Sequence, residues 1–482
     1  MKSILSIDCG TTSTRAILFD HSQNIIASSQ LNLALSHPKP DWIEQDPNEI
    51  WVKTHECLNK IIDNVSESVI HAIGITNQRE TAIIWNKDTG EPIGPAISWQ
   101  CRRTSNICKE LITHSKLIKK RTGLPLDPYF SATKFQWLLK EYPETNFLIK
   151  ENKLCFGTVD TWILWKLTNG TSYATDVTNA SRTMLYNIQT LSYDDTLCDL
   201  FGIPQELLPT VYHSSHNFGT YRTKNNIAIP IQGIIGDQQA ALYAQCGQKN
   251  NMIKNTYGTG LFLMANTGST IIQSDSMVST IAIGINDTID YAIEGSVFTG
   301  GSLVQWLRDN LGIIDSAEQS EELANSIKSS ENVVIVPALS GLGAPYWKPE
   351  ATGIITGLTR STSKAHIIRA ALESIAFQTN DLLNCISSEC PELNFDLMRV
   401  DGGASNNHWL MKFQSDISKI IIEKPVSIEA TALGAALCAA KLTNCWSDYS
   451  ITADTKFSPS LADNHRQQLL SRWSETIKKY YD

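Results

Sequence analysis

The sequence predicts an α/β protein of two related lobes, because one turn motif occurs once in each half of its 482 residues. Near the start, residues 10–13 (Gly-Thr-Thr-Ser) separate two apolar runs, which is the pattern of a strand–turn–strand. Residues 257–260 (Tyr-Gly-Thr-Gly) again stand between apolar runs. Backbone N–H groups at such turns attract anions, so a pair of them suggests two lobes gripping one polyphosphate. Taken alone, the first turn is equally consistent with an ordinary polar hairpin.

Strands and helices alternate through the first half, which is typical of an α/β layer architecture. After the opening hairpin, residues 24–33 predict a third strand. A helix should then begin at Pro47, with Asp46 as its N-cap and Glu49 closing a capping box. The further elements expected here are strands 69–76 and 81–85 with a turn at 86–90, helix 132–142, helix 161–167 with Asp160 as N-cap and Asn169-Gly170 as its end, strand 231–235, and helix 238–246 stopped by Gly247.

The second half again alternates strands and helices, after a polar, glycine-bearing stretch at 247–252. We place the boundary between the lobes there, giving lobes 1–247 and 248–482. The elements expected there are strands on both sides of the second turn up to Met264, helix 302–311, helix 365–385, strand 397–400, helix 429–442 and a terminal helix 464–480.

Composition excludes several classes of protein. A net charge of −9 argues against a nucleic-acid or anionic-membrane binder, which would show a basic face. Eleven scattered cysteines without a Cys-x-x-Cys pair indicate reduced thiols rather than a disulfide framework or zinc ribbon. No apolar run approaches transmembrane length and no signal-peptide core is present, so a cytoplasmic protein without an integral membrane segment is expected.

Two charged residues flank the first turn. Asp8 ends the first strand, where a carboxylate would hold a hard cation such as Mg²⁺ against phosphate oxygens. Arg15 adds a permanent positive charge with a planar fork of donors.

Asp237 is the most informative carboxylate. It stands between an apolar strand and a helix, at the strand end where α/β folds place their ligands. One interpretation is a plain N-cap of the helix. The other is a general base that accepts a hydroxyl proton during phosphoryl transfer, and the two roles are compatible.

Polar and aromatic residues in the first half suit a small polyol. Residues 77–80 (Asn-Gln-Arg-Glu) interrupt two apolar strands, as a tight solvated turn or as a pocket wall. Trp99 and Tyr129 follow nearby, and aromatic faces beside forked polar groups match the C–H edges and hydroxyls of a polyol. The Gly-x-x-x-x-Gly-Lys loop and the protein-kinase motifs are missing, so ATP would be held by the paired hairpins.

Several segments together resemble the FGGY carbohydrate kinases, and the pattern around residues 77–80 and 237–239 is most similar to the members that act on glycerol. The segments that carry this resemblance are 8–16, 74–81, 99–104, 157–162, 236–241 and 255–260, with family signatures at 129–137 and 353–373. The resemblance implies a ribonuclease H-like fold, of the type found in actin and hexokinase, with an ATP cleft between the lobes. It also implies ATP-dependent phosphorylation of glycerol to sn-glycerol 3-phosphate, the first step of glycerol catabolism, and a homodimer or homotetramer.

The resemblance further implies residue roles. ATP and Mg²⁺ are the expected cofactors, with Asp8 on the metal and Asp237 as the base. The glycerol pocket would be lined by Arg79, Glu80, Trp99, Tyr129, Asp237, Gln238 and Phe262. The nucleotide would be held by Thr11, Thr12, Ser13, Arg15, Thr259, Gly301, Gln305, Gly403 and Asn407, the last two around the adenine.

Three departures from the family pattern stand out. Cys9 replaces a usual Gln, and His408 replaces a common Asn or Asp beside the expected adenine site. Residues 221–226 lack the Gly-Lys-Gly-Gly loop that binds fructose 1,6-bisphosphate in some relatives. The alternatives that remain are an FGGY kinase for another polyol or ketose, and a nucleotide-binding sensor on the same fold.

Overall fold

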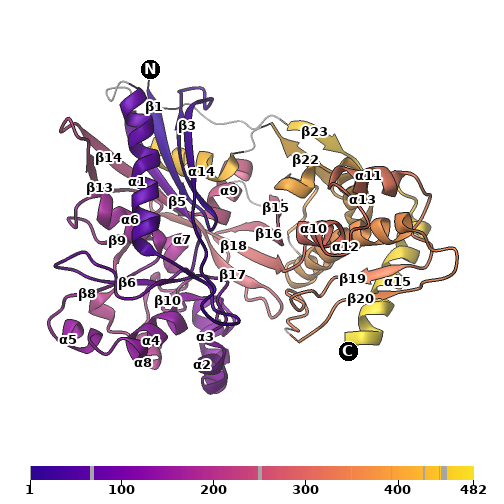
Figure 1. The fold of residues 1–482 in the computed structure, drawn as a ribbon, viewed down its shortest axis with the longest axis horizontal. Coiled ribbons are helices and arrows are strands. Elements are labelled where there is room, and N and C mark those ends of the chain that lie inside the picture. The colour runs from indigo at the N-terminus through magenta and orange to yellow at the C-terminus, as the bar shows by residue number, and fades with distance from the viewer. Residues whose placement is uncertain are drawn as a thin grey trace.

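The computed structural model describes residues 2–65, 70–247, 252–348, 350–391, 393–426, 429–443, 446 and 453–481. They form two lobes side by side, each built on one mixed β-sheet (Figure 1). In the part of the chain so described, no helix combines the length and the apolar character that crossing a lipid bilayer requires.

The first lobe is built on a six-stranded sheet of order β13-β14-β5-β1-β2-β3. β1, β5 and β14 run parallel, and β2 and β3 continue antiparallel from β1, which confirms the opening hairpin and the third strand. Its strands are β1 (Ser3–Cys9), β2 (Ser13–Phe19), β3 (Ile25–Asn32), β5 (Ile70–Asn77), β13 (Ser215–Arg222) and β14 (Ala228–Gly236). Of the expected strand 69–76, Val69 lies outside the described residues.

The second lobe repeats this plan in a seven-stranded sheet of order β17-β18-β16-β15-β21-β22-β23. β15 pairs antiparallel with β16 on one side and parallel with β21 on the other, as β1 pairs with β2 and β5. The shared pairing confirms the prediction of two related lobes. Its strands are β15 (Ile253–Tyr257), β16 (Leu261–Gly268), β17 (Val278–Ile285), β18 (Thr288–Val297), β21 (Leu397–Asp401), β22 (Ile421–Pro425) and β23 (Ala453–Phe457).

Helices cover both sheets. The helices that matter most here are α1 (Pro47–Asn64), α6 (Val159–Leu167), α9 (Asp237–Cys246), α10 (Gly301–Asp309), α12 (Lys364–Glu389), α13 (His408–Ser418), α14 (Ala430–Thr443) and α15 (Asp463–Tyr481). Asp46 caps α1 by accepting the Asn48 N–H at 2.8 Å, as predicted. The capping box is wrong, because the Glu49 carboxylate accepts the Ala34 N–H and pairs with Lys53 instead.

An insertion between β5 and β14 forms an extra layer beneath the first sheet, at the lower left of Figure 1. It contains β6 (Ile83–Asn86), β7 (Ala96–Ile97), α2 (Ser105–Glu110), α3 (Ser115–Thr122), α4 (Ser131–Glu141), α5 (Thr145–Lys150), β8 (Leu154–Gly157) and α8 (Asp195–Phe201). Helix α6 packs instead against β5 and β13 of the first sheet, and α7 (Val177–Ala180) packs against β14 and β17. The prediction that Asp160 caps α6 is wrong: the N-cap is Thr158. Asp160 is buried in the first turn of the helix, where the hydroxyls of Thr158 and Thr175 donate to its carboxylate at 2.5 and 2.6 Å.

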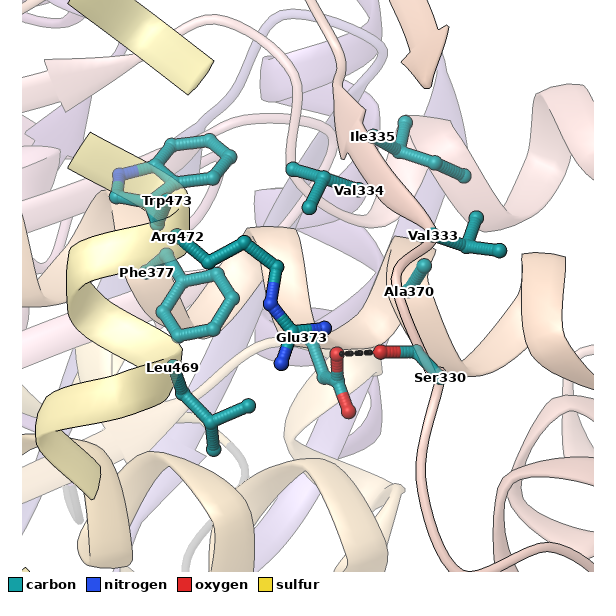
Figure 2. Close-up of a pocket in the computed structure, with 10 residues that line it drawn as sticks. All are labelled: Ser330, Val333, Val334, Ile335, Ala370, Glu373, Phe377, Leu469, Arg472 and Trp473. Carbon is teal, nitrogen blue, oxygen red and sulfur yellow. Dashed lines mark hydrogen bonds between the residues drawn. The ribbon is translucent and has the colours of Figure 1, made fainter. Parts of the chain in front are cut away.

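In the second lobe α12 packs against α13 and against β19 (Val334–Val336), and α15 covers them near the C-terminus. A cavity of about 10 Å³ remains between these elements, lined by none of the expected site residues. Figure 2 shows its polar corner, where the Ser330 hydroxyl donates to the buried Glu373 carboxylate at 2.7 Å. The Arg369 guanidinium donates to the same carboxylate at 3.1 Å, so this cluster ties α12 to the loop before β19.

Helix α14 belongs to the second half of the sequence but packs against α9, β5 and β14 of the first lobe. Glycines bring the backbones into direct contact at this crossing. A Cβ at Gly434 would lie 2.0 Å from the Ala240 carbonyl oxygen, and one at Gly74 would lie 2.2 Å from that of Ala435. Together with α9, this helix closes one face of the first sheet.

We therefore expect Gly434→Ala to destabilise the protein. The new methyl group overlaps backbone rather than a flexible side chain, so the helices must separate, at a cost of about 2–3 kcal/mol. The measurement is the midpoint of thermal and urea unfolding. Gly403→Ala is the control, because a Cβ there meets nothing within 4 Å. Equal midpoints for Gly434→Ala and the parent chain would contradict the packing argument.

Candidate active site

The turn between β1 and β2 is held by side chains and backbone from three other segments. The Thr11 hydroxyl accepts the Trp99 indole N–H at 2.9 Å. The Thr11 carbonyl accepts Gln45 Nε2, and the Thr12 carbonyl accepts the Leu33 N–H, both at 2.9 Å. Because the carbonyls are engaged in this way, the position of the turn is fixed before any ligand binds.

Asp8 and Arg15 face each other across the β1–β2 pair. The Arg15 guanidinium pairs with the Asp8 carboxylate and also with Glu429, which immediately precedes α14. Burial raises the pKa of Asp8, and Arg15 opposes that rise. Arg15 therefore links the first turn to the segment that returns from the second lobe.

The donors at this turn fit Mg²⁺. The Asp8 carboxylate and the neighbouring threonine hydroxyls are hard oxygen ligands, which Mg²⁺ prefers. Within the described ranges there is no group of three or more His, Cys, Asp or Glu that could form a metal cage. Mg²⁺ held by one or two carboxylates and by substrate phosphates needs no such cage.

The second turn, between β15 and β16, is clamped to the start of α10. The Thr259 carbonyl accepts the Gly300 N–H at 2.8 Å and the Ser302 hydroxyl at 2.8 Å. Gly301 approaches so closely that a Cβ would lie 2.7 Å from the Gly258 carbonyl oxygen. Gln305 lies exposed one turn further along α10. Thr259, Gly301 and Gln305 are thus brought to one place, as expected.

The residues expected around the adenine follow β21. Gly402 has φ of +86°, and a Cβ there would lie 2.5 Å from the Tyr257 carbonyl oxygen, so the chain folds back onto β15. Gly403 is exposed, with open space beside it. Asn407 caps α13 by accepting the Leu410 N–H at 2.9 Å. The sequence analysis missed α13, although Asn407 before an apolar run is a helix-start signal.

Three aromatic rings expected at the polyol site lie together. The ring centroids of Trp99 and Tyr129 are 5.6 Å apart, and those of Trp99 and Phe262 are 6.4 Å apart. Phe262 comes from the second lobe, on β16, whereas the other two come from the insertion. The aromatic part of the site therefore spans both lobes.

The charged part of the site lies at the end of β5 and the start of α9. Arg79 is buried, and its Nε lies 3.2 Å from the Asp237 carboxylate and 3.8 Å from that of Glu80. Glu80 has a left-handed backbone with φ of +62°, which is strained for a non-glycine residue. The structure thus brings these three predicted residues together, and residues 77–80 are buried, so they are not a solvated turn.

Asp237 is the first residue of α9, and Gly236 is the N-cap, so a plain N-cap role is ruled out. Its side chain keeps 29% exposure, while Arg79 beneath it keeps 2%. Burial raises the pKa of Asp237 to about 6; Arg79 opposes the rise, and the charges of Glu80 and Asp8 add to it. Such a carboxylate is ionised at neutral pH and is basic enough to accept a proton.

The sequence analysis missed two charged residues, Arg182 and Glu294, which contact Arg79 and Glu80. Arg182 Nε donates to Glu80 at 2.5 Å, and its Nη2 donates to Glu294 at 3.0 Å. Glu294 Oε2 accepts Arg79 Nη1 at 2.7 Å. The only signal in the sequence is a charged residue inside an apolar strand pattern, at Glu294.

Lys134 was also missed, although it lies inside one of the family signatures. Its buried ammonium donates to the backbone carbonyls of Tyr129, Phe130 at 3.1 Å, and Glu80 at 3.4 Å. Burial lowers the pKa of Lys134 to about 7, although Glu80 opposes this. Lys134 therefore joins the two segments that carry Tyr129 and the strained Glu80. A second buried lysine, Lys254, donates to Gln238 at 2.8 Å.

The chain is similar over its whole length to known glycerol kinases. The chain is 46% identical to glycerol kinase 2 of Thermotoga maritima over 491 residues, covering 99% of both chains. It is 47% identical to the glycerol kinase of Petrotoga mobilis over 489 residues, covering 99% of this chain and 98% of that one. The crystal structure of Plasmodium falciparum glycerol kinase with ADP superposes with a TM-score of 0.95 at 36% identity, covering 100% and 99% of the two chains.

Family models agree over most of the length. Residues 3–244 match the N-terminal domain of the FGGY family of carbohydrate kinases, and residues 253–442 match the C-terminal domain of that family. The expected fold, with its two related α/β lobes, is confirmed. Because both family models match and relatives 46–47% identical cover almost the whole chain, this chain belongs to the FGGY family of carbohydrate kinases.

Proposed function

We propose that this chain transfers the γ-phosphoryl group of ATP to a terminal hydroxyl of glycerol, giving sn-glycerol 3-phosphate and ADP. The observation that carries this proposal is the position of Asp237, a basic carboxylate beside Arg79 and Glu80, in a chain 46% identical to a named glycerol kinase. A coupled assay of ADP release over a panel of polyols and ketoses tests it. A ketose used better than glycerol would overturn the substrate assignment.

The polyol binds where Arg79 and Glu80 meet the three rings. Arg79 donates to hydroxyl oxygens, the Glu80 carboxylate accepts from hydroxyl groups, and the faces of Trp99, Tyr129 and Phe262 contact C–H edges. Asp237 accepts the proton of the attacking hydroxyl. Gln238, held by Lys254, lies on the same helix turn and completes the pocket.

The nucleotide lies across both turns. Thr11, Thr12, Ser13 and Arg15 contact phosphate oxygens from the first lobe, and Thr259, Gly301 and Gln305 approach from the second. The open surface at Gly403 beside Asn407 accommodates the adenine. Asp8 would hold Mg²⁺, which neutralises charge on the phosphates when bound.

A non-catalytic sensor on the same fold is the second candidate. A sensor needs the two phosphate turns but not a basic carboxylate that faces a polyol pocket. Asp237 beside Arg79 therefore favours the kinase. ATP turnover that depends on glycerol distinguishes the two.

We further propose that the lobes correspond to residues 1–247 and 248–482, apart from α14, which packs on the first lobe, and that they close on their ligands. All strands of the first sheet precede Gly247 and all strands of the second follow Met252, which supports this division. The expected hinge at 247–252 falls partly outside the described residues. Closure expels water that would otherwise compete with glycerol for the phosphoryl group.

We therefore expect ATP-site and glycerol ligands together to compact the protein more than either alone. Small-angle scattering of the free, singly bound and doubly bound forms measures the radius of gyration, with a nonhydrolysable ATP analogue to prevent turnover. Identical radii in all four states, together with unchanged amide exchange between the lobes, would exclude closure.

Assembly and location remain predictions. A homodimer or homotetramer is expected, and light scattering coupled to size-exclusion chromatography measures it. We place the protein in the cytoplasm, where ATP is available; the ten cysteines of the described part, all free thiols, are in keeping with a reducing compartment.

A further inference from the structure

Glu294 is a buried carboxylate of the second lobe that reaches into the polyol site of the first. It lies on β18, between its partners β16 and β17, and keeps 1% exposure. Its two oxygens contact Arg79 and Arg182, which come from the end of β5 and from the segment after α7. Arg79 is separated from Glu294 by 215 positions in the sequence, and Arg182 is separated from it by 112.

The contact occupies the fork of Arg79. Nη1 donates to Glu294 Oε2 at 2.7 Å and Nη2 donates to Glu294 Oε1 at 3.3 Å, and Gln239 takes a further bond from Nη1 at 3.0 Å. Its Nε lies 3.2 Å from the Asp237 carboxylate as an ion pair. Arginine makes its strongest pairs with carboxylates through both arms of the fork, so Asp237 receives the weaker side of this guanidinium.

We propose that Glu294 is a positioning residue that holds the fork of Arg79 away from Asp237, so that Asp237 stays basic and the pocket keeps its shape. This inference rests on the proposed glycerol kinase function and extends it. Glu294 touches neither substrate directly; it acts through Arg79 on the base and through Arg182 on Glu80.

Charges in the site support this assignment. Burial alone would raise the pKa of Glu294, but Arg182 and Arg79 lower it to about 2, so Glu294 is ionised at every working pH. The charged groups that face Asp237 are Arg79, Glu80 and Asp8, with Lys254 approaching from β15. Among these Arg79 alone forms an ion pair with Asp237, so its orientation decides the basicity of the site.

Glu294→Gln is the direct test. The amide leaves Arg79 free to turn its fork toward Asp237, which stabilises the ionised carboxylate and lowers its pKa. Because the base must be ionised, kcat/KM for glycerol falls on the acid side of that pKa, and this acid limb should move to lower pH by roughly one unit. KM for glycerol should rise about tenfold or more, since Arg79 and Glu80 both lose their support, while KM for ATP stays within about twofold.

Two further variants make the test specific. Arg182→Gln keeps Glu294 on Arg79, so its acid limb should not move to lower pH, although KM for glycerol should rise. The double variant Arg182→Gln, Glu294→Gln leaves the buried charge balance unchanged and should show the acid shift; it replaces the single variant if that one fails to fold. Asp381→Asn is the matched control, a half-buried carboxylate bonded to Tyr346 and Trp473 instead of the site, and its profile should not change.

The outcomes separate this inference from the proposed function. A parent chain that does not phosphorylate glycerol would overturn the proposed function. Calorimetric titration with glycerol would then still compare the affinity of Glu294→Gln with that of the parent. Equal affinities would overturn the positioning role. An active parent whose acid limb and glycerol KM are unchanged in both Glu294 variants would overturn the inference alone.

Discussion

Replacing Asp237 with asparagine is expected to lower kcat about a hundredfold or more while the protein stays folded. The amide has the same shape but cannot accept the hydroxyl proton, and positioned proton transfer contributes about this much. Asp237 keeps 29% exposure at the start of α9, and its bond from the Gln238 N–H can be made equally to an amide oxygen. Saturating glycerol and ATP isolate kcat from binding effects.

Binding and pH dependence provide the controls for this experiment. ADP affinity, measured by calorimetry, should be unchanged in Asp237→Asn, because no nucleotide contact is assigned to this residue. In the parent chain, kcat/KM should fall below a pH of about 6, where Asp237 becomes protonated. The pH profile of the variant should lack this fall. Asp290→Asn, a half-buried carboxylate on β18 outside the site, should behave like the parent. Near-normal turnover in a folded Asp237→Asn variant would contradict the assignment of the base.

The second large effect is discrimination between glycerol and 1,2-propanediol, which lacks one terminal hydroxyl. Arg79 and Glu80 are buried and held in place by Glu294, Arg182 and Lys134, so they cannot turn to other partners when that hydroxyl is missing. A site built to hydrogen-bond a hydroxyl rejects the analogue lacking it by roughly 10⁴-fold. The specificity constants of the two compounds, measured in one coupled assay, give the ratio directly.

A variant with a damaged pocket serves as the control for substrate choice. Glu80→Ala removes one hydroxyl partner, so it should lower kcat/KM for glycerol far more than for 1,2-propanediol and narrow the ratio. Equal specificity constants for the two compounds in the parent chain would show that Arg79 and Glu80 do not read adjacent hydroxyls.

Local patterns in the sequence were enough to predict most of the fold. The glycine–threonine turns, the Asp46 N-cap and the apolar strands depend on neighbours in the chain, and the structure has each of them. The N-cap at Asp160 failed because two threonine hydroxyls, one of them from Thr175 fifteen residues away, satisfy that carboxylate instead.

The supporting residues of the candidate site are harder to predict for the same reason. Arg79, Glu80 and Asp237 stand at strand ends or interrupt apolar runs, and a pattern can mark them. Glu294 and Arg182 support the site through contacts with partners more than a hundred positions away, and no local periodicity encodes such contacts. Lys134 lies on an ordinary helix, and only the three carbonyls around its ammonium distinguish it.

The return of α14 to the first lobe has a consequence for synthesis on the ribosome. One face of the first sheet is closed by α14, whose alanines pack against Ile4, Ile235 and Ala240. That face therefore stays only partly covered, by α9, until the chain has been made as far as Thr443, roughly 200 residues after the last strand of the sheet. At about 5–20 residues per second, the nascent lobe waits roughly 10–40 seconds with apolar surface exposed. A fragment ending at Gly247 would remain in that state, and chaperones that hold apolar surfaces should bind it.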